Sequence, residues 1–179
     1  MSDYVAELRV EALISAQGCP EPIVERMLRT AMVDFYRESL SWRYTTEVAS
    51  VVAGFPDVEI PLPEFTLIGR VYWAKLDGKV LSAVSPRNID GSRKGRATGY
   101  AINGISRTIQ LNAIPEESFI LNGVQANVAL MPMPTLVDLP DELFNSHRDG
   151  ILYGAISKLL AMPNVPWSDL NSAMIYGNM

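Results

Sequence analysis

The chain has 179 residues, of which 48% are hydrophobic and 20% charged, and its formal charge is −5 at pH 7. This length suffices for one domain with a proper core and argues against two full domains, and the composition excludes wholesale disorder. The acidic balance would repel a nucleic-acid backbone, and the single cysteine, Cys19, excludes a disulfide framework and a cysteine-rich zinc site.

The N-terminal region predicts two helices. Residues 3–16 have an apolar helical pattern that ends at Gly18. The motif GCPEP then predicts a new helix over residues 22–43, because proline suits the first turn of a helix and carboxylates complement its positive end.

No apolar run near the N-terminus has signal-peptide length, and no segment of the chain approaches the roughly 20 apolar residues of a membrane span. We therefore expect a protein made in the cytoplasm, with no membrane partner.

The second helix carries an apolar stripe with a charge inside it. Phe35 and Trp42 belong to this stripe, and we expect both to anchor the helix in the core, with Trp42 as the last anchor. Glu38 falls within the same sector. A carboxylate on an apolar face is costly unless it is paired, so Glu38 needs a partner.

From Tyr44 the pattern becomes extended and predicts an antiparallel β region. Asp77-Gly78 and Asn103-Gly104 each lie between alternating runs and predict two-residue hairpin turns. Residues 123–134 predict a last strand that is ended by prolines.

The segment between the two predicted hairpins is the only local concentration of positive charge. It has basic residues among Gly and Ser, and we expect a mobile loop that could contact a channel or a partner; a solvated hairpin connection is the simpler interpretation. The four residues are Arg87, Arg93, Lys94 and Arg96.

The C-terminal region predicts a helix that begins after Pro140 and ends at Pro163. Gly150, Gly154 and Ala161 give it a stripe of small residues that would let another helix approach closely. The last segment, residues 165–179, predicts a short helix after Ser168 or an extended arm.

Arg148 lies in the middle of the apolar sector of this C-terminal helix. Since Glu38 is a lone charge on the apolar face of the second helix, we predict a buried ion pair between Glu38 and Arg148. Such a pair would fix the register of the two helices more than it would add stability, because desolvation offsets much of the attraction.

These elements predict an α+β fold in which a helical bundle, built from the N- and C-terminal segments, carries an inserted antiparallel β-hairpin region. Residues 1–43 supply the N-terminal core helices, residues 44–134 the β insertion, and residues 135–179 the C-terminal core helix and a docking tail. We expect these three segments to form one domain.

The sequence offers little for catalysis, and we expect neither an enzyme nor a cofactor or metal. His147 stands beside Ser146 and Asp149, but neighbouring helical positions point in different directions, so a structural histidine is favoured over a catalytic relay. Cys19 has no cationic neighbour to activate it. Trp73, Tyr72 and Tyr100 could form a stacking platform for sugars or bases, although packing within the sheet is the favoured interpretation.

Two stretches of the chain resemble a known family. The helix that ends in Ser-x-x-Trp-Arg, Ser39 to Arg43, and the segment YGAISKLLAMPNVPWSD are similar to the tailed-bacteriophage head-to-tail adaptor proteins, also called head completion or connector proteins. The similarity covers roughly residues 18–175.

The resemblance implies a structural virion protein of the phage neck. Proteins of this family form a ring, usually of twelve copies, between the portal and the tail or the next neck protein. The bore of the ring belongs to the channel that retains and later ejects the genomic DNA. By position the C-terminal segment would dock onto the portal, although the family often has a longer C-terminal helix. The residues expected to dock are Trp167, Met174, Ile175, Tyr176 and Met179.

Two alternatives remain open at this stage. The chain could be a tail-terminator or stopper-type neck protein, for which a different copy number would be expected. It could also be a β-rich module that binds a carbohydrate or host surface, with Trp73 and Tyr100 as the platform.

Overall fold

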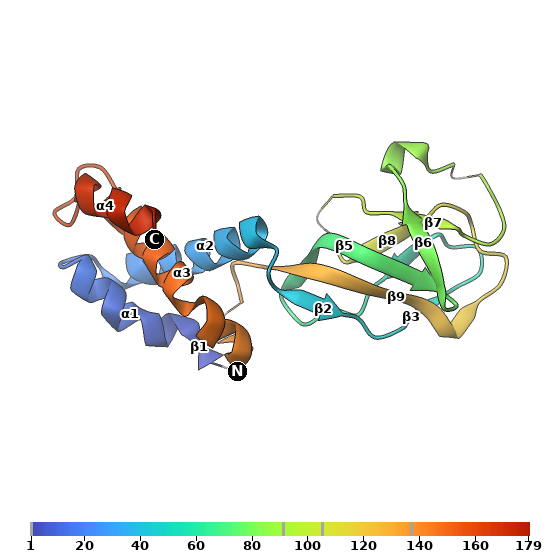
Figure 1. Cartoon of the computed structure of the whole chain (residues 1–179), viewed down its shortest axis with the longest axis horizontal. Helices are drawn as coiled ribbons and strands as arrows, with labels where there is room; N and C mark the ends of the chain where they lie inside the picture. The colour runs from blue at the N-terminus through green and yellow to red at the C-terminus, as the bar shows by residue number, and fades with distance from the viewer. Residues whose placement is uncertain (1, 91, 105, 137) are drawn as a thin grey trace. The chain divides into compact units, whose positions relative to one another are not determined.

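The helices and strands of the chain belong to two compact units (Figure 1). The computed structural model describes residues 2–90, 92–104, 106–136 and 138–179. The helical unit comprises Met1–Ser39 and Pro132–Met179, and the β unit comprises Leu40–Met131. The boundaries expected from the sequence, 43/44 and 134/135, lie a few residues from these.

The helical unit contains four helices in the described part of the chain: α1 (Tyr4–Ser15), α2 (Glu21–Ser39), α3 (Asp141–Leu160) and α4 (Leu170–Gly177). The two-residue strands β1 (Ser2–Asp3) and β10 (Asp138–Leu139) pair with each other. Asp3 starts α1, because its carboxylate accepts hydrogen bonds from the backbone N–H groups of Val5 and Ala6. The most deeply buried side chains of this unit include Tyr4, Leu8, Val24, Leu28, Met32, Ile151 and Leu159.

Helices α2 and α3 pack closely because α3 carries glycine where α2 crosses it. A Cβ on Gly150 would lie 2.8 Å from a ring carbon of Phe35, and one on Gly154 would lie 3.6 Å from the Cβ of Ala31. The predicted small-residue stripe is confirmed at these two positions. Ala161, its third member, is exposed.

The prediction that the second helix continues to Trp42 and Arg43 is wrong. Helix α2 ends at Ser39, and Leu40 has φ 51°, a left-handed conformation that stops helical hydrogen bonding. Trp42 is buried, but it lies beyond the helix, where its carbonyl accepts a hydrogen bond of 2.8 Å from the N–H of Leu130. Trp42 therefore belongs to the β unit and does not anchor α2.

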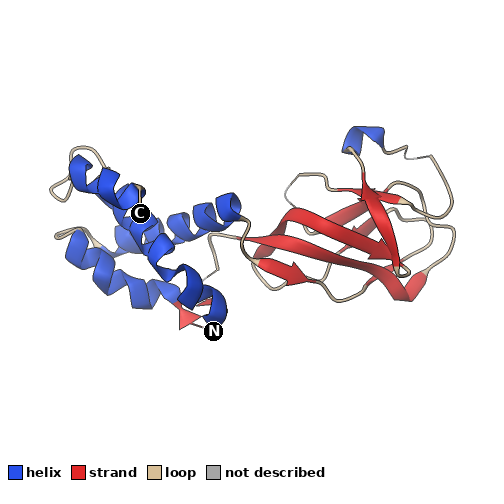
Figure 2. Cartoon of the chain, viewed as in Figure 1, coloured by secondary structure: helices blue, strands red, loops and turns tan. Residues whose placement is uncertain are grey.

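The strands of the β unit form one eight-stranded sheet in the described residues (Figure 2). Its order is β2-β9-β5-β6-β7-β8-β4, and β3 also pairs with β9. The strands are β2 (Arg43–Thr45), β3 (Ala49–Val51), β4 (Asp57–Glu59), β5 (Thr66–Leu76), β6 (Lys79–Ala83), β7 (Gly99–Ala101), β8 (Thr108–Leu111) and β9 (Phe119–Pro132).

This sheet overturns the predicted fold class of a helical bundle with inserted hairpins. Strand β4, the last in the order, contacts β3 at the other side of the sheet, so the sheet curls back towards itself. Its interior is filled by apolar residues of its own, among them Ile60, Ile68, Leu76, Ile109, Leu111, Val124 and Val128. The β region therefore has a core and is a unit in its own right, not a set of hairpins attached to helices.

The Asp77-Gly78 hairpin is confirmed. Both residues have positive φ, 50° and 71°, as a two-residue turn of this kind requires, and Leu76 pairs with Lys79 across it. Around Asn103-Gly104 the strands β7 and β8 do pair, but residues 102–107 separate them. The N–H of Ile68 donates to the carbonyl of Ser106, which draws this longer loop onto β5.

One strand pairing departs from the predicted antiparallel pattern. Strands β6 and β7 are parallel, with Ser82 opposite Gly99, and the connection between them carries the basic loop.

Strands β3 and β9 approach each other closely at Gly123. A Cβ on this residue would lie 1.9 Å from the carbonyl oxygen of Ala49, so only glycine lets the two strands meet there.

Candidate interaction surfaces

The predicted ion pair between Glu38 and Arg148 is not formed. The Arg148 guanidinium binds Glu11 of α1 and the adjacent Asp149, and hydrogen bonding to Glu11 raises its pKa. Glu38 is exposed on α2. The reason is geometric: the Arg148 side of α3 faces α1, whereas α2 packs on α3 through Phe35 and Gly150.

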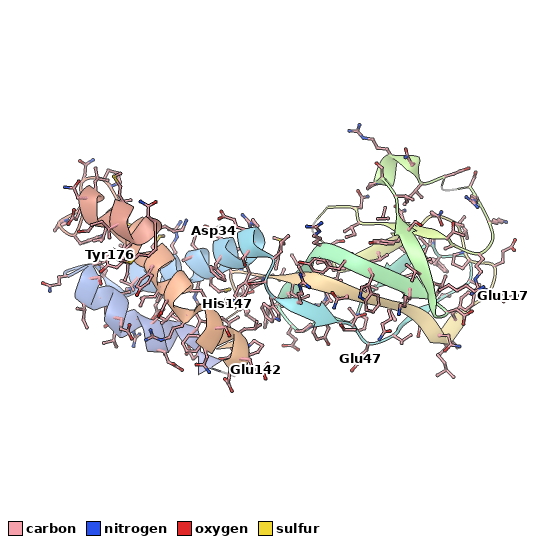
Figure 3. The ribbon with its side chains drawn as sticks, in the orientation of Figure 1. Asp34, Glu47, Glu117, Glu142, His147 and Tyr176 are labelled. Carbon is pink, nitrogen blue, oxygen red and sulfur yellow. The ribbon has the colours of Figure 1, made fainter. Side chains whose placement is uncertain are left out.

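Phe35 anchors α2 through an aromatic cluster rather than through the apolar stripe alone. Its ring lies 5.4 Å from that of Tyr36 and 5.1 Å from that of His147. The Tyr36 hydroxyl and His147 Nδ1 are 3.3 Å apart, within hydrogen-bonding distance. Burial raises the pKa of Tyr36. His147, labelled in Figure 3, is therefore a packing residue that joins α3 to α2.

Other reactive side chains occupy ordinary environments. Cys19 is buried, its thiol donates to the Pro20 carbonyl, and burial raises its pKa, which disfavours the nucleophilic thiolate. In the described residues no three His, Cys, Asp or Glu side chains converge at metal-binding distances.

The basic loop is attached to the sheet at one end. The Arg93 carbonyl accepts from the N–H of Ile114 at 2.7 Å, and the N–H of Gly95 donates back to Ile114, so Lys94 bridges to that residue. Arg96 pairs with Asp77 at 2.6 Å. Arg87 and Arg93 are exposed in this part of the chain.

Helix α4 exposes most of its apolar residues. It starts at Asp169, whose carboxylate accepts from the N–H groups of Asn171 and Ser172, and it is held to α3 by the Ser157 hydroxyl, which donates to the Ala173 carbonyl. Ala173 is its only buried residue among those described. Met174 is 69% and Ile175 58% exposed, and Leu170 and Met179 are exposed as well.

The other two residues of the predicted docking segment are less exposed. The Tyr176 ring lies against that of Tyr153 of α3, with ring centroids 5.8 Å apart and the rings tilted by 42°; Tyr176 is labelled in Figure 3. Trp167 is half-buried, and its indole N–H has no hydrogen-bond partner among the described atoms.

A cleft of about 430 Å³ lies among α2, α3 and α4. Its floor contains Gly150 and Gly154, and its aromatic walls are Phe35, Tyr153 and Tyr176. Two carboxylates, Asp34 and Glu38, and the ammonium of Lys158 also line it, and Lys158 is 2.9 Å from Asp34.

The β unit has an apolar rim that sequence reasoning missed. Hydrogen bonds bring its parts together: the Ala53 N–H donates to the Ser118 hydroxyl, and the Asp77 N–H to the Asn122 carbonyl. Leu121 is 87% and Ile120 71% exposed. We define the apolar rim as Val52, Phe55, Val80, Ile120 and Leu121. The sequence signal was the adjacent apolar pair Ile120-Leu121, which breaks the alternation expected of a strand with one buried face.

The stacking platform considered for Trp73 and Tyr100 is not formed. Tyr100 is buried in β7, and burial raises its pKa, so its ring belongs to the core of the sheet. Trp73 is half-buried, with the Lys75 ammonium 4.9 Å from its ring.

Tyr72, the third aromatic residue considered for the platform, has two arginines beside its ring. The guanidinium carbon of Arg43 lies 4.4 Å from the centroid of the Tyr72 ring, and that of Arg70 lies 5.6 Å from it. The Tyr72 hydroxyl donates to the Leu40 carbonyl, which fixes the ring. Both arginines are exposed, and neither pairs with a carboxylate in the described part of the chain.

The charge is divided unevenly between the units. The helical unit has twelve Asp and Glu against six Lys and Arg, a formal charge of −6, whereas the β unit has eight against nine, a formal charge of +1. The acidity of the whole chain therefore resides in the helical unit.

Comparison with protein-family models and with curated protein sequences gives no match to this chain. Within the described residues, every helix is too short or too polar to cross a lipid bilayer.

Proposed function

We propose that this protein is a structural component of a tailed-phage virion, located in the neck, where it forms a ring between the portal and the tail. The ring has twelve copies, as in the family that the sequence resembles, and genomic DNA passes through its bore in transient, non-specific proximity. The role is structural, with no reaction catalysed and no cofactor bound.

The observation that carries this proposal is the exposed apolar face of α4. A short helix that packs on α3 through Ala173 and Tyr176 and leaves Met174 and Ile175 in water is typical of an interface segment, because large exposed apolar groups mark sites where a partner binds. Methionine and aromatic residues are also enriched in interface cores. We assign this face to the portal.

The apolar rim supplies a second surface, on the other unit. Two separate apolar surfaces suit a protein that binds a different partner with each, as an adaptor must. We assign the rim to the tail or to the next neck protein. The net negative charge of the chain would limit adhesion of the passing DNA.

Paired variants test this assignment. Met174→Ser/Ile175→Ser is expected to weaken portal binding at least about tenfold, because each buried apolar side chain contributes about 1.5–3 kcal/mol. Ile120→Ser/Leu121→Ser is the matched control: it removes two apolar residues from the rim that are at least as exposed as Met174 and Ile175, and it should leave portal binding unchanged. This rim variant should instead bind the tail-side partner more weakly.

Affinity for the purified portal, measured by biolayer interferometry, separates the outcomes. The proposal is supported if only the α4 variant loses portal binding. Unchanged portal binding by the α4 variant would contradict the assignment of α4, and absence of portal binding by the wild-type chain would contradict the proposed function.

A tail-terminator or stopper role belongs to the same class of neck protein. A copy number that differs from that of the portal would favour it over the adaptor role.

A further inference from the structure

Arg43, Arg70 and Tyr72 form a charged cluster on the β unit that the proposed portal and tail contacts do not use. Arg43 is the first residue of β2, and the other two lie on β5; β9 separates these strands in the sheet. Both guanidinium groups lie within 6 Å of the centroid of one ring, so two positive charges are gathered at one place on the sheet. An oxyanion bound there would offset this local positive charge.

The two guanidinium groups of the cluster are suited to bind a carboxylate or a phosphate. Each guanidinium presents a planar fork of N–H donors that matches two oxygens of such a group. Stacking on Tyr72 holds both side chains in place, which lowers the entropy lost when an anion binds. The Leu40 carbonyl in turn fixes Tyr72.

The distribution of charge favours a protein carboxylate over DNA. A DNA-binding surface neutralises a row of phosphates, whereas the β unit has a formal charge of only +1 and the chain one of −5. The helical unit, by contrast, carries a formal charge of −6. A second copy of this chain therefore presents the complementary surface.

Within the helical unit, Glu38 is the carboxylate best placed for such a contact. It lines the cleft among α2, α3 and α4, is exposed, and has no basic partner in the described residues, whereas Asp34 is paired with Lys158. The aromatic walls of this cleft, Phe35 and Tyr153, offer flat surfaces on which a guanidinium can stack.

We propose that Arg43 and Arg70, held by Tyr72, bind the Glu38 side of this cleft on a neighbouring copy. The contact joins two different surfaces, so it is heterologous, and such contacts close into rings when the rotation between copies permits. This inference rests on the proposed ring and assigns one of its subunit contacts.

A charge-swap series tests the contact in the full chain. Arg70→Glu and Glu38→Arg are each expected to weaken self-association about tenfold, and the double variant Glu38→Arg/Arg70→Glu should restore it to within about threefold of wild type. The matched control is Lys79→Glu, which reverses one exposed charge of the same unit that makes no cation–π contact with Tyr72. The association constants are measured by sedimentation velocity over a concentration series, with the protein alone and with the portal present. Unchanged midpoints of thermal unfolding show that each variant is folded.

Restoration by the double variant, with an unaffected control, supports the contact. The contact is overturned if Arg70→Glu associates like wild type or if the control weakens self-association as much as Arg70→Glu does. It is also overturned if the double variant shows the sum of the two single-variant defects. Loss of DNA binding with unchanged association in Arg70→Glu would also overturn it, because the cluster would then bind nucleic acid. Normal rings from both single variants would leave the proposed function standing, whereas a wild-type chain that remains monomeric alone and with the portal would contradict both.

Discussion

Gly150 and Gly154 lie one turn apart on α3, yet α2 approaches them at different distances. A methyl group at position 150 would meet the ring of Phe35 at 2.8 Å, whereas one at position 154 would meet the Cβ of Ala31 at an ordinary 3.6 Å. The same substitution should therefore have opposite effects at the two positions.

We expect Gly154→Ala to stabilise the helical unit by up to about 1 kcal/mol, because alanine favours a helix over glycine. Gly150→Ala should destabilise it by about 1–2 kcal/mol, since displacement of Phe35 disturbs its packing on His147. Urea unfolding monitored by circular dichroism gives both free energies of unfolding. Equal effects at the two positions would show that Phe35 does not pack on Gly150 as described.

Residue patterns predicted that Glu38 and Arg148 need partners but did not identify those partners. A helical wheel gives the direction of a side chain around its own helix, and it contains no information on which neighbour lies in that direction. Arg148 faces α1, where Glu11 binds it. The contact of Arg43 with the Tyr72 ring could not be predicted either, because it depends on the order of β2, β9 and β5 in the sheet.

Helix α4 begins at a carboxylate whose pKa is lowered by folding, so we expect its formation to depend on pH. The Ser172 hydroxyl, the Ser172 N–H and the Asn171 N–H all bind the Asp169 carboxylate and hold its pKa below the ordinary value. A group whose pKa is lowered by folding stabilises the folded form fully above its ordinary pKa. That stabilisation is lost as the pH falls through the lower, folded value.

We therefore expect α4 to fray reversibly in acid, from about pH 4 downwards. Asp169→Asn is the matched control, because asparagine also caps a helix but does not titrate in this range. The ¹³Cα chemical shifts of α4 between pH 6 and 2.5 measure its helical content. A wild-type transition that persists unchanged in Asp169→Asn would contradict the role of the carboxylate.

The β unit is expected to fold without the helices. Its two ends meet inside its own sheet, where Arg43 pairs with Ala129 and the Leu130 N–H donates to the Trp42 carbonyl. Its core is also its own, with Ile68, Ile109 and Val128 buried among strands of the same unit.

A fragment of residues 40–131 should accordingly give a dispersed amide spectrum and a cooperative thermal transition. A fragment of residues 40–123, which lacks most of β9, should remain unfolded, because β9 pairs with both β2 and β3. A collapsed spectrum for residues 40–131 would show that the β unit depends on the helical unit.

Local elements were largely predictable, and their assembly was not. Apolar periodicity and proline positions located α2 and α3, and the Asp77-Gly78 turn is set by residues next to each other in the sequence. The pairing of β9 with β2 and β3, and the parallel pairing of β6 with β7, join segments far apart in the chain. Hairpin signals say nothing of such pairings, so a curled sheet with its own core was mistaken for attached hairpins.

At the scale of the whole molecule, each unit has a distinct surface chemistry. The helical unit is acidic and exposes the apolar face of α4, whereas the β unit is slightly basic and carries the apolar rim and the Tyr72 cluster. A chain whose units expose different surfaces is suited to contacts with different partners and with copies of itself. This division supports the proposed role in assembly.

The most direct test of that role is electron microscopy of the purified protein mixed with the portal of the same virus. We expect a ring of this protein on one end of the portal, with twelve copies and with α4 at the contact. A portal that remains bare at concentrations well above those of assembly, or a ring that contacts it without α4, would contradict the proposed role.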